Sequence, residues 1–263
     1  MRLLRHRPIV SGNERRLGLV WNGARWPHWG LPLSLLMAVL SMTLVAEAAR
    51  IVGKVSGFMY LRNPVWQEAK NPNEHGYSFR EPVPTVRADY RQLFPHIPKE
   101  VCIALIAGVP TKPQKPVLVR VGGGRTTPVT IVLAPGTRIA FQNTDPFDHS
   151  LYAVGLPSFS PSRTKPGDQR EWTVPGEGVF EIRDKLAPSL RFWVVGHPKV
   201  ASIAYPSMAG EFALSVPEPG TYQVQPYFAG EPVGTPVEVE FKGKDVDLRR
   251  APIKLADKKK DEG

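Results

Sequence analysis

The amino-acid sequence predicts an all-β protein, and three observations support this prediction. Short apolar runs recur from Ile51 to Phe241, and turn residues separate each run from the next. Proline is abundant, with 28 residues in a chain of 263, about twice its usual share. Because proline breaks helix interiors but suits turns, its placement between the runs favours strands. No long amphipathic helix interrupts this pattern, so we expect a β-sandwich of many short strands.

Residues 1–48 have the features of a secretory signal peptide. Six arginines precede an uncharged run of 16 residues, Leu31 to Ala46, and the small-x-small sequence Ala46-Glu47-Ala48 follows. A basic leader, an apolar run and a cleavage signal in this order are typical of exported proteins. The run is short for a membrane-spanning helix, which needs about 20 residues. We expect cleavage after Ala48, no stable transmembrane span afterwards, and a location in the periplasm or on the cell surface. An uncleaved membrane anchor is the alternative.

Charge and cysteine content restrict the function. The whole chain has a net charge of +10, and removal of the six arginines and two glutamates of residues 1–48 leaves +6. No basic run is interleaved with aromatic residues, so we expect no nucleic-acid partner. Cys102, the only cysteine, lies in the apolar run VCIALIAG. An intramolecular disulfide is therefore excluded, and the thiol is predicted to be buried.

The apolar runs between residues 49 and 247 define the expected strands, and Pro-Gly dipeptides mark several of the turns. The expected strands are Ile51–Tyr60, Val101–Gly108, Val117–Val121, Val129–Leu133, Arg138–Gln142, Ser150–Val154, Arg170–Val174, Gly178–Ile182, Leu190–Val195, Glu211–Ser215, Gly220–Pro226 and Thr235–Phe241. The glycine run VGGGRT, residues 121–126, lacks the Gly-Lys-Ser/Thr ending of a phosphate-binding loop. We therefore predict a hairpin turn there.

The segment from Asn63 to Glu100 is a long, proline-rich and aromatic connection between two expected strands. Connections of this length are uncommon in compact domains unless they are functional or disordered. Its large apolar side chains need burial, either on the chain's own sandwich or on a partner, where aromatic residues and arginine often dominate binding. The candidate partner surface consists of Trp66, Tyr77, Phe79, Arg80, Arg87, Tyr90, Arg91 and Phe94.

A histidine, His149, follows an Asn-x-Asp turn in the stretch FQNTDPFDHSLYAV. The longer stretch VTIVLAPGTRIAFQNTDPFDHSLYAV, followed by TKPGDQREWTVPGEGVFEI, resembles the bacterial plastocyanin- or azurin-like cupredoxins of exported proteins. This resemblance covers about Val129 to Val200 and implies a Greek-key β-sandwich of cupredoxin type. It also implies that His149 occupies the position of the first copper ligand. A cysteine, a second histidine and a weak axial methionine would complete such a site.

The other ligand positions carry different residues in GVFEIRDKLAPSLRFW. An ungapped match places Asp184 at the cysteine position, Ala187 at the second histidine position and Leu190 at the methionine position. We therefore expect these positions, together with His149, to be vestigial, with no bound metal and no cofactor. The same match predicts that His149 and Asp184 lie close together. His197 follows a strand and has no preceding cysteine, so it is predicted to be a turn residue.

The flanking regions carry a second resemblance, to carboxypeptidase-regulatory-like (transthyretin-like) β-domains. The stretch AGEFALSVPEPGTYQVQPYF contains the Gly-x-Phe-x-Leu strand and the Pro-Gly-x-Tyr turn of that family. The resemblance implies an accessory β-sandwich that contains the cupredoxin-like unit as an insertion. The expected organisation is a signal peptide over 1–48, first accessory strands over 49–115 with the aromatic loop 63–100, a cupredoxin-like domain over 116–205, closing accessory strands over 206–247 and a charged tail over 248–263.

No catalytic motif is present: the sequence has neither Gly-x-Ser-x-Gly nor His-Glu-x-x-His. We expect a non-enzyme, an exported cupredoxin-like protein that has lost its copper site. It would be a binding or structural component of the cell envelope, with a protein partner there. Two alternatives stay open: a periplasmic copper-binding electron-transfer or copper-carrier protein, and a cell-surface carbohydrate-binding module. Exposure of Trp66, Tyr77 or Trp172 in a shallow groove would favour the carbohydrate-binding module.

Overall fold

The structure, a computed structural model, describes residues 49–65 and 95–257. The predicted signal peptide over 1–48 and the candidate partner surface from Trp66 to Phe94 lie outside these residues. Within the described ranges, no helix is long and apolar enough to cross a membrane. Strands dominate these ranges, which confirms the predicted all-β sandwich class.

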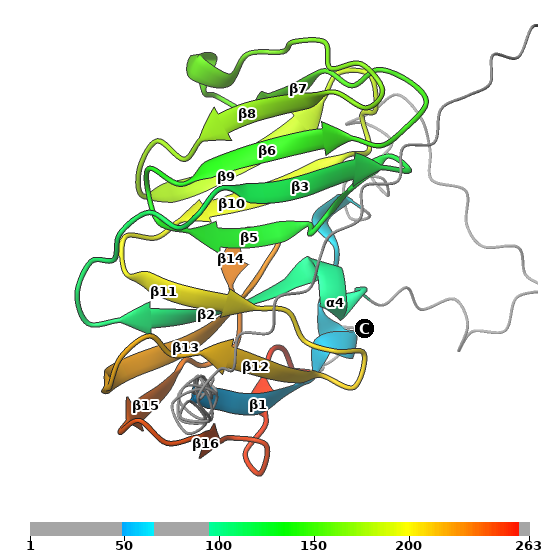
Figure 1. The fold of residues 1–263 in the computed structure, drawn as a ribbon. Helices are drawn as coiled ribbons and strands as arrows, with labels where there is room; N and C mark the ends of the chain where they lie inside the picture. Colours follow the sequence, from blue (N-terminus) through cyan, green and yellow to red (C-terminus); the bar gives the residue numbers. More distant parts are fainter. Residues whose placement is uncertain (1–48, 66–94, 258–263) are drawn as a thin grey trace, which may run out of the picture. The chain divides into compact units, whose positions relative to one another are not determined.

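Two four-stranded sheets form the first sandwich (Figure 1). Its elements are β3 (Val117–Gly122), β4 (Arg125–Thr127), β5 (Thr130–Leu133), β6 (Arg138–Asn143), β7 (Leu151–Ala153), the 3-10 helix η3 (Pro157–Phe159), β8 (Gln169–Thr173), β9 (Gly178–Asp184) and β10 (Arg191–Gly196). One sheet has the order β4-β3-β6-β8 and the other β5-β10-β9-β7. Residues of both sheets share one core, in which the rings of Phe141 and Phe192 meet edge to face at 5.7 Å.

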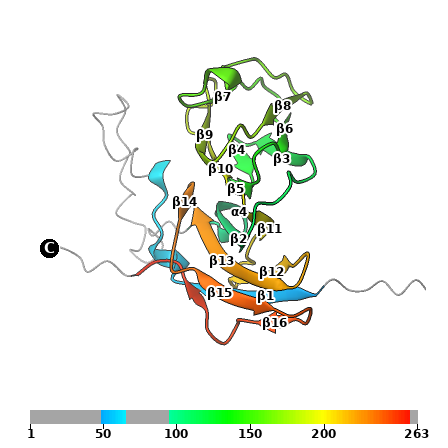
Figure 2. The same ribbon diagram turned by 90° about the vertical axis from the view of Figure 1, so that its left-hand side faces the viewer.

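A four-stranded and a five-stranded sheet form the second sandwich (Figures 1 and 2). Its elements are β1 (Arg50–Ser56), the 3-10 helix η1 (Phe58–Tyr60), α4 (Ile97–Glu100), β2 (Val101–Ala107), β11 (Val200–Ala204), β12 (Glu211–Ser215), β13 (Gly220–Phe228), β14 (Glu231–Pro232), β15 (Val237–Phe241), β16 (Val246–Asp247) and β17 (Ile253–Lys254). The smaller sheet has the order β12-β1-β16, with β17 also paired to β1. The larger has the order β11-β2-β13-β14, with β15 paired to β13.

The strand β2 is buried along both of its faces, as its unbroken apolar sequence predicts. Ile103 and Leu105 belong to the core of the second sandwich. Cys102 and Ala104 instead pack in a separate cluster that includes Val132 of β5. The two sandwiches therefore share an apolar junction, and the prediction of a buried Cys102 is confirmed.

The C-terminal region differs from the expected charged tail over 248–263. Ile253 pairs with Val55 of β1, and both Ile253 and Leu255 are buried in the second core. The expectation that the chain leaves the sheet at residue 248 is therefore wrong for these residues, because a two-residue strand has no periodicity to detect.

The strand β11 also went unrecognised in the sequence. It lies inside the range 116–205 that was predicted to be cupredoxin-like, yet it pairs with β2 of the second sandwich. The remainder of the predicted domain division stays a prediction.

Candidate functional site

His149 is held at one end of the first sandwich by the turn that follows β6. The buried side chain of Asn143 shapes this turn: its Nδ2 donates to the carbonyls of Phe147 (2.8 Å) and Thr164 (3.0 Å), and its Oδ1 accepts the amide of Asp145 (2.9 Å). Asn commonly forms local bonds of this kind in turns. The His149 backbone pairs with Thr164 in both directions. These bonds fix the imidazole in a site where it is 1% exposed.

Asp184, the last residue of β9, contacts the histidine ring directly. Its Oδ2 lies 2.6 Å from Nδ1 of His149, which confirms the prediction that the two residues lie close together. The other oxygen, Oδ1, accepts the amides of Ser150 (3.1 Å), Leu186 (2.7 Å) and Ala187 (3.3 Å). This buried carboxylate therefore has hydrogen-bond partners on both oxygens.

Asp145 completes the site and was not selected from the sequence. Its Oδ2 lies 3.0 Å from Nε2 of His149, on the side of the ring opposite Asp184. The Gly123 amide donates to Oδ1 (2.8 Å) and the Gly124 amide to Oδ2 (3.5 Å). Burial raises the pKa of Asp145, but the bonds from Gly123, His149 and Gly124 outweigh it, so the pKa lies below its ordinary value. The only signal for Asp145 was its place in the Asn-x-Asp turn.

The glycine run forms the predicted hairpin turn between β3 and β4, with Gly122 opposite Arg125. Gly123 and Gly124 have φ angles of 61° and 68°, a conformation that glycine adopts without the cost of a Cβ. This conformation aims two successive amides at the Asp145 carboxylate. The turn thus binds an anion, but the anion is a side chain of the same protein.

The geometry specifies the hydrogen-bonding state of His149. An ionised carboxylate only accepts, so each ring nitrogen that faces one must carry a proton. Asp184 faces Nδ1 and Asp145 faces Nε2, so between two ionised carboxylates the ring would donate from both nitrogens. In this state the imidazole has no lone pair for a metal ion.

The other two sequence-predicted positions provide apolar contacts. Leu190 is fully buried in the core of the first sandwich, and Ala187 packs against the same core. The Leu190 amide donates to the Ala187 carbonyl (2.9 Å), so the two residues belong to one tight turn. Neither side chain offers an atom that binds metal.

A copper ion of the cupredoxin kind does not fit the residues at this end of the sandwich. Its thiolate ligand is missing, since Cys102, the single cysteine, lies in β2 with its pKa raised to about 12 by burial. Among residues 49–65 and 95–257, no group of three or more His, Cys, Asp or Glu side chains is arranged to hold a metal ion. His197 accepts the Lys199 amide (3.2 Å) after β10, in agreement with its prediction as a turn residue.

The carbohydrate-binding alternative required an exposed aromatic side chain. Trp172 is buried in the first core, where its ring contacts Phe159 and Phe180. It offers no surface for stacking a sugar. The other two aromatic residues named for this role, Trp66 and Tyr77, lie outside the described residues.

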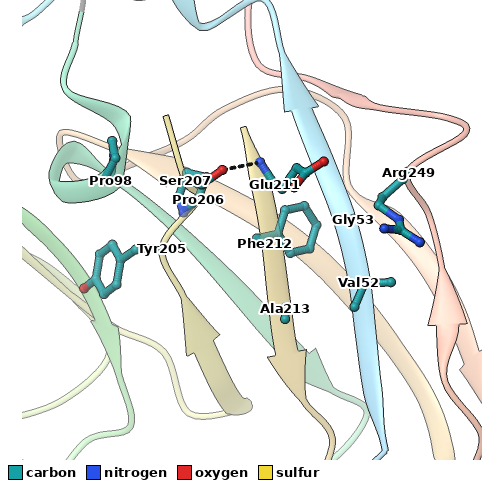
Figure 3. A pocket seen from close by; sticks show the side chains of 10 residues that line it. All are labelled: Val52, Gly53, Pro98, Tyr205, Pro206, Ser207, Glu211, Phe212, Ala213 and Arg249. Carbon is teal, nitrogen blue, oxygen red and sulfur yellow. Dashed lines mark hydrogen bonds between the residues drawn. The ribbon is translucent and has the colours of Figure 1, made fainter. Parts of the chain in front are cut away.

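A pocket of about 570 Å³ lies on the second sandwich, beside β1 and β12 (Figure 3). The Ser207 hydroxyl accepts the Glu211 amide at its rim (3.2 Å), and Arg249 is paired with Asp247 (2.7 Å). No residue predicted from the sequence as functional lines this pocket, and we assign it no function. Its lining residues are Val52, Gly53, Pro98, Tyr205, Pro206, Ser207, Glu211, Phe212, Ala213 and Arg249.

No family model and no curated protein matches the chain. Solved structures similar to part of it include cupredoxins and a copper-containing nitrite reductase. A purple cupredoxin from Nitrosopumilus maritimus is 18% identical over 31% of this chain and 99% of its own, with a TM-score of 0.29. Amicyanin from Paracoccus versutus is 15% identical over 35% and 91%, also with a TM-score of 0.29. The nitrite reductase from Thermus scotoductus SA-01 is 18% identical over 33% of this chain and 23% of its own, again with a TM-score of 0.29.

These matches cover about a third of the chain. The transthyretin-like resemblance of the flanking sheets has no support among them and stays a prediction.

Proposed function

We propose that this chain is an exported, non-catalytic protein whose cupredoxin-like sandwich has lost its copper site. In this proposal it acts as a binding or structural component of the cell envelope. One observation carries the loss of copper: both ring nitrogens of the buried His149 are hydrogen-bonded to carboxylates. A histidine in this state is not a metal ligand.

The residues around His149 support the same conclusion by their chemistry. A type 1 copper site depends on a thiolate in the metal plane and a soft sulfur on the axis. Asp184 supplies only carboxylate oxygens, and these already accept four hydrogen bonds. Leu190, which the sequence match assigns to the axial ligand position, is a fully buried hydrocarbon side chain.

Copper titration of the mature protein, residues 49–263, tests this part of the proposal. We expect no thiolate-to-copper absorption band and no stoichiometric copper signal by electron paramagnetic resonance. A variant with His149 replaced by glutamine is the matched control, because adventitious copper on surface groups would be equal in both proteins. Stoichiometric copper that binds the natural chain and is lost in this variant would refute the proposal.

The envelope role rests on the predicted signal peptide and on the aromatic segment from Trp66 to Phe94. N-terminal sequencing of protein from the envelope fraction should begin at Ala49. Cross-linking in intact cells should join the chain to an envelope protein. Replacing Pro72 to Pro95 by a short Gly-Ser bridge should abolish the cross-link without unfolding the sandwiches. An unchanged cross-link in the shortened variant would mean that the partner surface lies outside this segment. Cytoplasmic protein that retains Met1 would refute export.

A further inference from the structure

The chain of contacts through His149 connects three loops that come from different strand pairs. The β3–β4 turn contributes the amides of Gly123 and Gly124, which bind Asp145. The β6–β7 turn contributes Asp145 and His149 themselves. The loop after β9 contributes Asp184, whose Oδ1 also holds the first residues of that loop. These contacts therefore link both sheets of the first sandwich, because β3 and β4 belong to one sheet and β9 to the other.

Both carboxylates that contact His149 are also hydrogen-bonded to the backbone. Backbone amides orient both carboxylates, two on Asp145 and three on Asp184. The ring of His149 lies between them at hydrogen-bond distance from each, and hydrogen bonds between ionised groups are stronger than neutral ones. The side chains of His149 and Asp184 are 1% and 0% exposed, and that of Asp145 is 11% exposed. Solvent therefore screens these contacts weakly.

We propose that Asp145, His149 and Asp184 form an ionic clasp, a built-in cross-link that fixes this end of the sandwich in the absence of a metal ion. The inference rests on the proposed loss of copper, and it adds a structural role for the residues at those positions. Asp184 acts in the clasp as a positioning residue: it fixes His149 through Nδ1 and the following loop through three amides.

If the three residues form one clasp, substitutions of its two carboxylates should have coupled effects on stability. Replacing Asp184 by asparagine removes the charge at Nδ1 and leaves the imidazolium with one carboxylate, and Asp145→Asn does the same at Nε2. Each single change should increase the unfolding equilibrium constant at least about tenfold, since hydrogen bonds to charged groups are worth more than neutral ones. Because both carboxylates act on one ring, the effects of the two changes should be non-additive in the double variant.

Asp148→Asn is the matched control for the clasp. Asp148 lies in the same turn, and its substitution removes the same charge, but its partner is the exposed Arg163 on the surface. Exposed ion pairs contribute little to stability. We expect this variant to change the unfolding equilibrium constant less than about threefold. Its effect should add to that of Asp184→Asn.

Nuclear magnetic resonance of the unmodified mature chain can distinguish the clasp from simple side-chain packing, because it detects the protons on the ring nitrogens of His149. We expect protons on both Nδ1 and Nε2 of His149, protected from exchange with water, and slow exchange of the Leu186 and Gly123 amides. In Asp184→Asn the Leu186 amide should exchange faster. If one ring nitrogen is unprotonated, or if the two carboxylate changes are additive, the clasp is refuted. Stoichiometric copper on His149 would refute the loss of copper as well, so the two failures are distinguishable.

Discussion

Asp184 lies 2.6 Å from Nδ1 of His149, at the sequence position where the cupredoxin pattern has a cysteine. The pair is buried, and the turn that joins Ala187 to Leu190 follows directly. In the proposed match to the cupredoxin pattern, this connection between β9 and β10 has the length of a ligand loop but lacks its ligand side chains. This arrangement suggests that ligand chemistry can be restored by substitution alone.

The combined variant Asp184→Cys, Ala187→His and Leu190→Met should acquire a copper site. Cys and His would supply the missing thiolate and imidazole, and Leu→Met is a volume-conserving change that buried sites usually tolerate. The expected result is one copper ion per chain with an intense visible absorption band, which we do not expect from the natural chain. Adding His149→Phe to the same variant should remove the band. A triple variant that folds and takes up no copper would mean that these positions do not correspond to the ligand positions.

The sequence predicted two of the three residues of this site, His149 and Asp184, and missed Asp145 for a physical reason. His149 and Asp184 were predicted to lie close together because an ungapped match to the cupredoxin pattern places both residues at ligand positions. Asp145 lies four residues before His149 in a turn that also contains Asp148. Nothing in one sequence distinguishes the carboxylate that faces the ring from the one that faces Arg163 on the surface.

The strands show a similar division between what the sequence can and cannot indicate. Long runs such as Val101 to Ala107 were recognised from apolar content alone, and the glycine run was recognised as a turn. The short strand β17 pairs with the distant strand β1, with Ile253 opposite Val55, and its two residues carry no alternation. Trp172 illustrates the limit for side chains: its position in a strand was expected, but the face on which it lies was not.

Stability should depend on acid pH through Asp145. The pKa of this carboxyl is lower in the folded protein than its ordinary value of 3.8. Its contribution is therefore present above that ordinary value and is lost as pH falls through the folded value. Asp145→Asn should lower the free energy of unfolding at pH 7, and the difference from the natural chain should shrink below about pH 4. Denaturant unfolding of both proteins at pH 7, 4 and 3 measures this difference in the free energy of unfolding. A difference that stays constant across this range would contradict the prediction.

Stability should also decline at alkaline pH through Cys102. Burial raises the thiol pKa to about 12 from 9.0, so between these values the unfolded chain loses a proton that the folded chain keeps. The free energy of unfolding should therefore fall as pH rises from about 9 towards 12. Burial also raises the pKa values of Tyr205 and Tyr227, which add to the fall above about pH 10. Cys102→Ala should flatten the profile between pH 9 and 10.

Thiol labelling gives an independent measurement of the same burial. The native chain should react with a thiol reagent at pH 8 only at the rate at which it unfolds, because the unreactive protonated thiol is also inaccessible. The chain in denaturant should react at the rate of a free cysteine. Rapid labelling of the native chain would show that Cys102 is open to solvent.

Gly53→Ala should destabilise the second sandwich, because a Cβ at Gly53 would lie 2.3 Å from Cζ of Phe212 on the neighbouring strand. The Phe212 ring is buried in the second core, so it must shift at the expense of its packing. We expect a loss of about 1–3 kcal/mol in the free energy of unfolding. Gly108→Ala is the control, since a Cβ there meets nothing within 4 Å. Adding Phe212→Leu to Gly53→Ala should recover part of the loss; if both glycine variants unfold alike, steric contact with Phe212 is not the cause.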